Sequence, residues 1–147
     1  MGTKAMTPPV GTTAQRPGGV DDEFNTGCLR FNTTLGALEY YNGSVWVQPG
    51  IESYSTISTN TSVVAQGNYF VNTNGGGVTA TLPASPDLGA KITFFDVAKT
   101  FDSNALTVSR NGKPIQGDSA NLTVSTEGAA FSLVFSGDTY GWRIFSI

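Results

Sequence analysis

Few side chains in this sequence are suited to acid–base or nucleophilic chemistry. Eleven residues are acidic, the single cysteine is Cys28, and histidine is absent. The absence of histidine excludes the Ser-His-Asp and Cys-His arrangements and nearly all catalytic zinc sites. Paired carboxylates remain, because two of them can carry out glycoside hydrolysis without histidine. A glycan hydrolase is therefore the enzyme class that the residue types leave open.

The carboxylates show no spacing that would pair them. Asp21, Asp22 and Glu23 lie in a stretch rich in proline and glycine, where nothing would hold them at a defined separation, so we interpret them as a solvated charge run. The other acidic candidates are scattered among predicted turns and strand ends, where Asp side chains usually bond to nearby backbone; they are Asp87, Asp96, Asp102, Asp118, Glu127 and Asp138. We therefore expect no catalytic residue, no metal site, no cofactor and no enzymatic activity.

Aromatic side chains are the second possible source of function, because flat rings stack on sugar faces and anchor protein interfaces. Tyr140 and Trp142 lie beside the last predicted turn and are the candidate contacts to a glycan. Tyr40 and Tyr41 are adjacent on a predicted strand and face opposite sides of it. One of these two tyrosines is thus expected to pack inward and the other to face solvent or a neighbour.

The composition excludes several broad classes of protein. The 147 residues suffice for one domain with a core, or for a small domain with a shorter module. With 13% charged residues and a net charge of −3, no basic surface is available to bind nucleic acid phosphates. No run approaches the roughly 20 apolar residues of a membrane span, so we expect no membrane insertion. The nine Phe, five Tyr and two Trp supply enough apolar area to exclude a disordered chain.

Residues 1–23 predict an extended N-terminal arm. They contain three prolines, several glycines and threonines, and almost no large apolar side chain. Proline restricts both itself and the preceding residue to extended geometry, which disfavours a helix. Such an arm is either a free tail or a segment that becomes ordered against a partner, and we favour docking for residues 11–17.

Residues 24–50 predict a three-stranded β-meander. Leu29 and Phe31 alternate with polar neighbours, and Asn42-Gly43 is the strongest two-residue hairpin signal in the sequence. Arg30 and Glu39 are expected on facing strands, where they can pair across the meander or between subunits. About 25 residues bury too little area for independent stability, so we expect the meander to pack on another subunit or on the following domain.

The rest of the chain predicts a connector and a β-domain. Residues 51–65 are rich in Ser and Thr and indicate a connector that ends in a strand. Residues 66–147 show short apolar segments separated by turn signals, which predict strands over 69–72, 77–82, 91–96, 105–110, 121–124, 130–136 and 142–147. The expected fold is all-β: a small antiparallel β-sandwich or barrel, preceded by the three-stranded meander and the extended N-terminal arm.

A motif covers residues 11 to 46. Residues 11–17 read GTTAQRP, and residues 27–46 read GCLRFNTTLGALEYYNGSVW. Together they resemble a module that recurs in virion proteins of tailed bacteriophages, especially in fibres and their attachment regions. The shared pattern is G-T-T-A-x-R-P, then G-x-L-R-[FY]-N, a turn, E-x-Y and G-x-x-W.

The resemblance implies a structural or host-attachment role in a virion, usually as a homotrimer. Because the chain is short and has no repetitive shaft, a short fibre, spike, or head or collar decoration subunit fits it better than a long tail fibre. Its partners would be further copies of itself and other virion proteins bound through residues 1–23, and it would be located in the virion after assembly in the host cytoplasm. The predicted interface residues are Arg30, Phe31, Tyr41 and Trp46. A carbohydrate-binding module for host-surface attachment is the alternative.

Overall fold

The computed structural model describes residues 7–17 and 26–145. The contacts within it divide the chain into two compact units, Met1–Glu52 and Ser53–Ile147. Among the described residues, the one helical segment is a short 3-10 turn, η1 (Thr13–Gln15), and all other regular structure is strand. The all-β class predicted from the alternation is therefore confirmed. No helix in the described part is long and apolar enough to cross a membrane.

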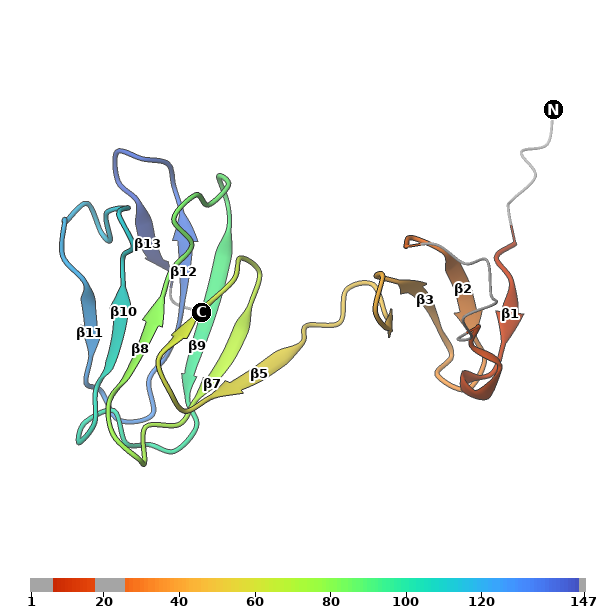
Figure 1. Cartoon of the computed structure of the whole chain (residues 1–147), viewed down its shortest axis with the longest axis horizontal. Helices are drawn as coiled ribbons and strands as arrows, with labels where there is room; N and C mark the ends of the chain where they lie inside the picture. Colours follow the sequence, from red (N-terminus) through yellow and green to blue (C-terminus); the bar gives the residue numbers. More distant parts are fainter. Residues whose placement is uncertain (1–6, 18–25, 146–147) are drawn as a thin grey trace. The chain divides into compact units, whose positions relative to one another are not determined.

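The N-terminal unit is built on one four-stranded sheet, in the order β1-β2-β3-β4. Its strands are β1 (Val10–Gly11), β2 (Leu29–Asn32), β3 (Ala37–Tyr41) and β4 (Trp46–Val47). β2, β3 and β4 form the predicted three-stranded meander, in a register that places Arg30 opposite Glu39. β1 adds to β2 in parallel, so part of the predicted arm is a strand of this sheet (Figure 1).

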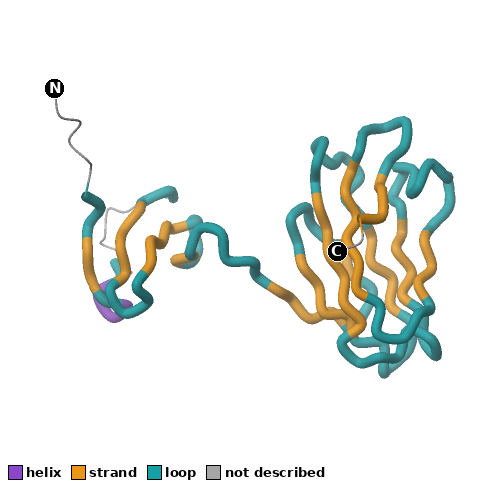
Figure 2. The backbone as a smooth tube through the Cα atoms, turned by 180° about the vertical axis from the view of Figure 1, so that it is seen from behind, coloured by secondary structure: helices purple, strands orange, loops and turns teal. Residues whose placement is uncertain are grey.

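The C-terminal unit contains two sheets that share one apolar core. One sheet has the order β13-β12-β9-β7-β5 and the other the order β11-β10-β8-β6. The strands are β5 (Tyr54–Ile57), β6 (Thr61–Ser62), β7 (Asn68–Val71), β8 (Val78–Thr81), β9 (Lys91–Asp96), β10 (Leu106–Ser109), β11 (Leu122–Val124), β12 (Ala130–Phe135) and β13 (Trp142–Phe145). Loops gather at both ends of these strands (Figure 2).

The chain winds between the two sheets of the C-terminal unit. From β5 to β10, each strand lies in the opposite sheet from the strand before it. As a result β7 pairs in parallel with β5 and β9, and β8 pairs in parallel with β6 and β10. The last strands join the sheets by antiparallel pairing. β11 pairs with β10, and β12 pairs with both β9 and β13.

The core of this unit draws on strands of both sheets. Phe94 of β9 and Leu133 of β12 come from one sheet, Val78 of β8 and Leu106 of β10 from the other, and all four are completely or almost completely buried. Phe101, from the loop after β9, is also completely buried in the same cluster. Burying side chains of this size stabilises a fold by about 1.5–3 kcal/mol each.

The predicted antiparallel sandwich or barrel is wrong in its topology. The sheets are mixed, with parallel pairing at their centres, and they do not close into a barrel. Turn signals such as the run of glycines at 75–77 mark a reversal of the chain, but they do not specify whether the next strand pairs with the previous one or crosses to the other sheet. From β5 to β10 the chain crosses each time, so these strands pair with the strand two positions away in the order of the chain.

The segment interpreted as a connector, residues 51–65, holds β5 and β6. These two strands form edges of the two sheets of the C-terminal unit. The segment is rich in Thr and Ser and has few large apolar residues, which suits edge strands that face solvent on one side.

A buried carboxylate organises one end of this unit. At the end of β9, Asp96 accepts hydrogen bonds from the backbone N–H groups of Thr100 at 3.1 Å, Phe101 at 3.2 Å and Gly128 at 2.9 Å. Burial by itself raises the pKa of this carboxyl, but the backbone donors outweigh burial and hold its pKa below the ordinary value. Asp96 therefore has a structural role in joining two loops.

Candidate functional site

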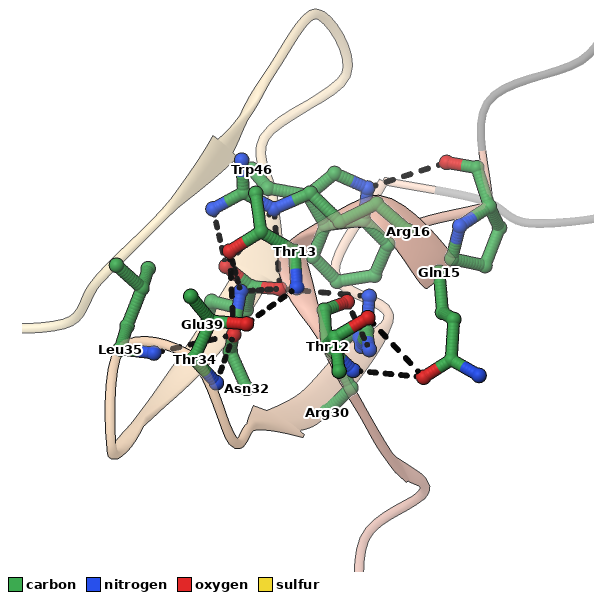
Figure 3. A network of polar contacts seen from close by, with 11 residues as sticks. Thr12, Thr13, Gln15, Arg16, Arg30, Asn32, Thr34, Leu35, Glu39 and Trp46 are labelled. Atoms are coloured by element: carbon green, nitrogen blue, oxygen red, sulfur yellow. Dashed lines mark hydrogen bonds and ion pairs between the residues drawn. The ribbon is translucent and has the colours of Figure 1, made fainter.

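The most distinctive site among the described residues is a buried polar network in the N-terminal unit. It joins η1 and the residues after it to one face of the β2–β3 pair (Figure 3). Arg30, Asn32 and Glu39 point to this face because they occupy alternate positions on paired strands. All three are buried, although such side chains are usually exposed.

Glu39 is the centre of the network. Its carboxylate accepts from Arg16 through Nη2 at 2.6 Å and through Nε at 3.1 Å and 3.2 Å, which is a two-pronged pairing. Asn32 Nδ2 donates to the same carboxylate at 3.1 Å. Arg30 Nη1 lies 3.6 Å from Glu39 Oε1. One buried acid thus meets two guanidinium groups from different parts of the chain.

Asn32 links this centre to the 3-10 turn and to the β2–β3 turn. Its Nδ2 donates to Thr13 Oγ1 at 3.0 Å, and its Oδ1 accepts from the backbone N–H groups of Thr34 at 3.0 Å and Leu35 at 3.2 Å. The backbone N–H of Thr13 in turn donates to Thr34 Oγ1 at 3.1 Å. The side chain of Asn32 therefore makes hydrogen bonds to the 3-10 turn, to the β2–β3 turn and to Glu39 on β3.

Arg30 fastens the arm to the sheet. Its Nη2 donates to the carbonyl of Thr12 at 3.0 Å, and its guanidinium carbon lies 5.8 Å from the ring centroid of Trp46. A Cβ at Gly11 would collide with Arg30 Nη2, so the absence of a side chain there permits the close approach of the two segments. Trp46 Nε1 donates to the carbonyl of Pro17 at 3.2 Å, which fastens the arm a second time.

The pairing shifts the protonation equilibria of both partners. The hydrogen bond from Arg16 is the largest cause that holds the pKa of Glu39 below its ordinary value, while burial opposes it. The same hydrogen bond raises the pKa of Arg16 above its ordinary value, against a smaller opposing effect of burial. Glu39 is therefore ionised at neutral pH and is a fixed ion-pair partner.

Sequence reasoning found part of this network. The facing positions of Arg30 and Glu39 were predicted and are confirmed, but the pair is buried and not exposed. Arg16 was not identified as a partner of Glu39, because their contact joins residues 23 positions apart. The one signal available was the presence of Arg16 within the GTTAQRP string.

The predicted interface residues lie on two different faces of the sheet. Arg30 is inside the network, and Tyr41 and Trp46 are paired across β3 and β4 on the same side, with their rings 5.7 Å apart. Phe31 alternates with Arg30 on β2 and therefore points to the opposite face. A pocket of about 320 Å³ with mostly apolar walls opens beside Arg30 and Trp46.

The two predicted glycan contacts differ in exposure. Trp142 is completely buried in the core, with its ring 5.4 Å from that of Phe135, so it offers no surface to a glycan. Tyr140 is exposed and lines a shallow hollow of about 360 Å³ with Ser136 and Arg143.

The carboxylates of the described residues form no cluster of the kind that binds a metal ion. No group of three or more His, Cys, Asp or Glu residues there has a geometry that could hold a metal ion. Asp21, Asp22 and Glu23 lie outside the described residues. Asp138 is paired with Lys113 at 2.7 Å on the surface.

No protein-family model matches this chain, and no curated protein gives a significant match to it.

Proposed function

We propose that this chain is a non-enzymatic structural subunit of a bacteriophage virion, a short fibre, spike, or head or collar decoration. In this proposal the N-terminal unit attaches to the particle, the C-terminal unit is presented outward, and the subunit assembles as a homotrimer. Val10–Gly11 and η1 are used inside the N-terminal unit, so attachment through residues 1–23 would involve the folded unit and not a free arm.

The observation that carries the proposal is that the polar positions of the phage-like motif form one connected network. Arg16, Arg30 and Asn32 each contact Glu39, and Trp46 is joined to the arm. Each of these polar groups is used to hold the shape of a small sheet. A motif whose residues serve shape and not chemistry supports a module used for attachment.

The test is incorporation of the chain into virus particles. We expect the full chain to co-sediment with purified particles of the virus that encodes it. The variant Glu39→Ala, which removes the centre of the network, should lose most of this association, because the N-terminal unit would no longer hold its shape.

The matched control is Asp138→Ala, which removes an exposed carboxylate from an ion pair in the C-terminal unit. This variant should co-sediment as the unmodified chain does. Absence of the chain from particles would contradict the proposal, and equal loss in both variants would contradict attachment through the N-terminal unit.

Carbohydrate binding is the second candidate function, favoured by the hollow at Tyr140. An exposed ring beside the guanidinium of Arg143 and the hydroxyl of Ser136 offers a stacking surface with polar groups at its edge. Calorimetric titration with bacterial surface glycans would test it. Tyr140→Ala should abolish binding while Leu88→Ala, at another exposed position of the same unit, should not; no heat of binding from the unmodified chain would exclude this function.

A further inference from the structure

The face of the N-terminal sheet opposite the network is apolar. Paired strands place Leu29 opposite Tyr40, Phe31 opposite Leu38, Val47 beside Tyr40, and Val10 beside Phe31. Residues paired in this way point to the same side of a sheet. These six residues, Val10, Leu29, Phe31, Leu38, Tyr40 and Val47, are referred to below as the apolar face.

The described residues of the N-terminal unit leave the apolar face largely uncovered. The exposed fractions are 62% for Val10, 47% for Leu29, 42% for Leu38 and 37% for Tyr40, while Phe31 and Val47 are half-buried. A free-standing antiparallel sheet normally does the opposite, with its apolar face on a core and its polar face in water. Here the covered face holds the ion pairs and the uncovered face holds the apolar side chains.

This inversion is unfavourable for a unit that stands alone. A buried ion-pair network contributes little net stability, because the cost of removing charges from water offsets their attraction. The described part of the N-terminal unit is also smaller than most domains that fold without staples. The unit therefore needs the apolar burial that its open face can provide.

The size of the apolar face matches one side of a protein interface. A large side chain exposes about 150–250 Å² when uncovered, so the four exposed fractions amount to roughly 350 Å² before Phe31 and Val47 are added. One partner of a standard interface buries about 800 Å², of which about 65% is apolar in homodimers, or roughly 500 Å². The apolar face therefore supplies the larger part of the apolar area of such a contact.

We infer that the apolar face is the contact between copies of this chain. None of its six residues is charged, so the copies of the trimer can bring this face together around a common symmetry axis without placing like charges together or burying an unpaired one. The inference rests on the self-association in the proposed function. It assigns the contact between copies to a different set of residues from the one predicted from the sequence. Of the four interface residues predicted from the sequence, only Phe31 lies on this face.

The experiment measures the solution mass of the full chain and of Leu38→Glu by light scattering over a range of concentrations. The unmodified chain should show a stable multiple of 15.4 kDa, and Leu38→Glu should shift to the single-chain mass, because it places a charge at the centre of the contact. The milder Leu38→Ala should raise the dissociation constant of the oligomer at least about tenfold.

The matched control is Leu35→Glu. Leu35 is 48% exposed and belongs to the same unit, but it lies in the β2–β3 turn and not on the apolar face, so this variant should keep the mass of the unmodified chain. Amide spectra of each variant report whether the unit is folded. Where Leu38→Glu unfolds it, Val10→Glu at the sheet edge tests the same face.

Each outcome is decisive. A monomeric unmodified chain would overturn the inference and leave the face to a partner of another kind. An oligomer that survives both Leu38→Glu and Val10→Glu in folded form would also overturn it, while leaving self-association, and with it the proposed function, intact.

Discussion

Glu39 shows how one residue defines a small unit. A carboxylate with no exposed surface is costly unless it is paired, and here Arg16, Arg30 and Asn32 supply the partners. Arg16 comes from the arm, and Arg30 and Asn32 come from β2. Loss of Glu39 would leave two guanidinium groups without their shared acid, so the arm and the sheet depend on the same side chain.

We expect Glu39→Gln to destabilise the N-terminal unit by about 3–5 kcal/mol, the usual cost of breaking a buried ion pair from one side. Amide hydrogen exchange over residues 29–47 measures this loss for the unit by itself. Asp138→Asn is the control, because it removes an exposed ion pair with Lys113 and should change stability by about 0–1 kcal/mol. Equal effects of the two substitutions would contradict the structural role of Glu39.

The lowered pKa of Glu39 makes the N-terminal unit sensitive to acid. Its folded pKa lies below the ordinary value of 4.5, so its contribution to the free energy of unfolding is fully present above that pH and is lost as pH falls through the folded pKa. Unfolding followed between pH 6 and pH 2 should show this loss. In Glu39→Gln the acid dependence should be smaller, and an unchanged dependence would assign it to other groups.

At the scale of elements, the pairing of strands sets the C-terminal unit apart from a simple sandwich. Strands β5 to β10 alternate between two sheets, so each connection crosses from one sheet to the other and none of them forms a hairpin. The alternation ends at β11, which pairs antiparallel with β10 in the same sheet. In the final hairpin of β12 and β13, Trp142 at the start of β13 donates its backbone N–H to the carbonyl of Pro114 at 2.8 Å. The loop before β11 is thereby held against the last strand.

Gly141 makes that contact possible, and its replacement should be costly. It has a φ of +66°, and a Cβ at this position would collide with the carbonyl of Pro114. We expect Gly141→Ala to lower the free energy of unfolding by about 1–3 kcal/mol more than Gly137→Ala does. Gly137 is the matched control, because it also has a positive φ, of +102°, but a Cβ there would meet nothing within 4 Å.

Thermal unfolding of the two glycine variants measures the difference. The cost of placing alanine at a positive φ is common to both, so any excess in Gly141→Ala reports the close approach to Pro114. Equal midpoints would show that the loop before β11 moves away without loss of stability.

At the scale of the whole molecule, the chain consists of two units with different sources of stability. The N-terminal unit is held by a buried polar network and leaves an apolar face open. The C-terminal unit has a continuous apolar core whose members run from Ile57 to Trp142. The two units therefore differ in where their apolar side chains lie.

We expect a fragment of residues 53–147 to fold without the rest of the chain. Every member of the buried core cluster lies within it, as does the Asp96 loop anchor. Its amide spectrum should overlay on the corresponding signals of the full chain, and its unfolding should be a single cooperative transition. A disordered fragment would show that this unit takes essential burial from residues 1–52.

The sequence by itself located many of the strands of the C-terminal unit. Apolar segments between turn signals gave β9 at its observed bounds and β12 to within a residue, and alternation indicated that residues 24–50 form a meander with Arg30 and Glu39 on facing strands. These features follow from local backbone geometry, because each depends on neighbours only a few residues away. The all-β class followed from the same signal.

Only the tertiary structure decided which strands pair and which side chains meet. The parallel pairing of β7 with β9, the contact of Arg16 with Glu39, and the burial of Trp142 all join or enclose residues far apart in the chain. Turn residues specify where a chain reverses, but pairing depends on which arrangement buries the most apolar area with every polar group satisfied. That balance is a property of the whole fold, and no local pattern records it.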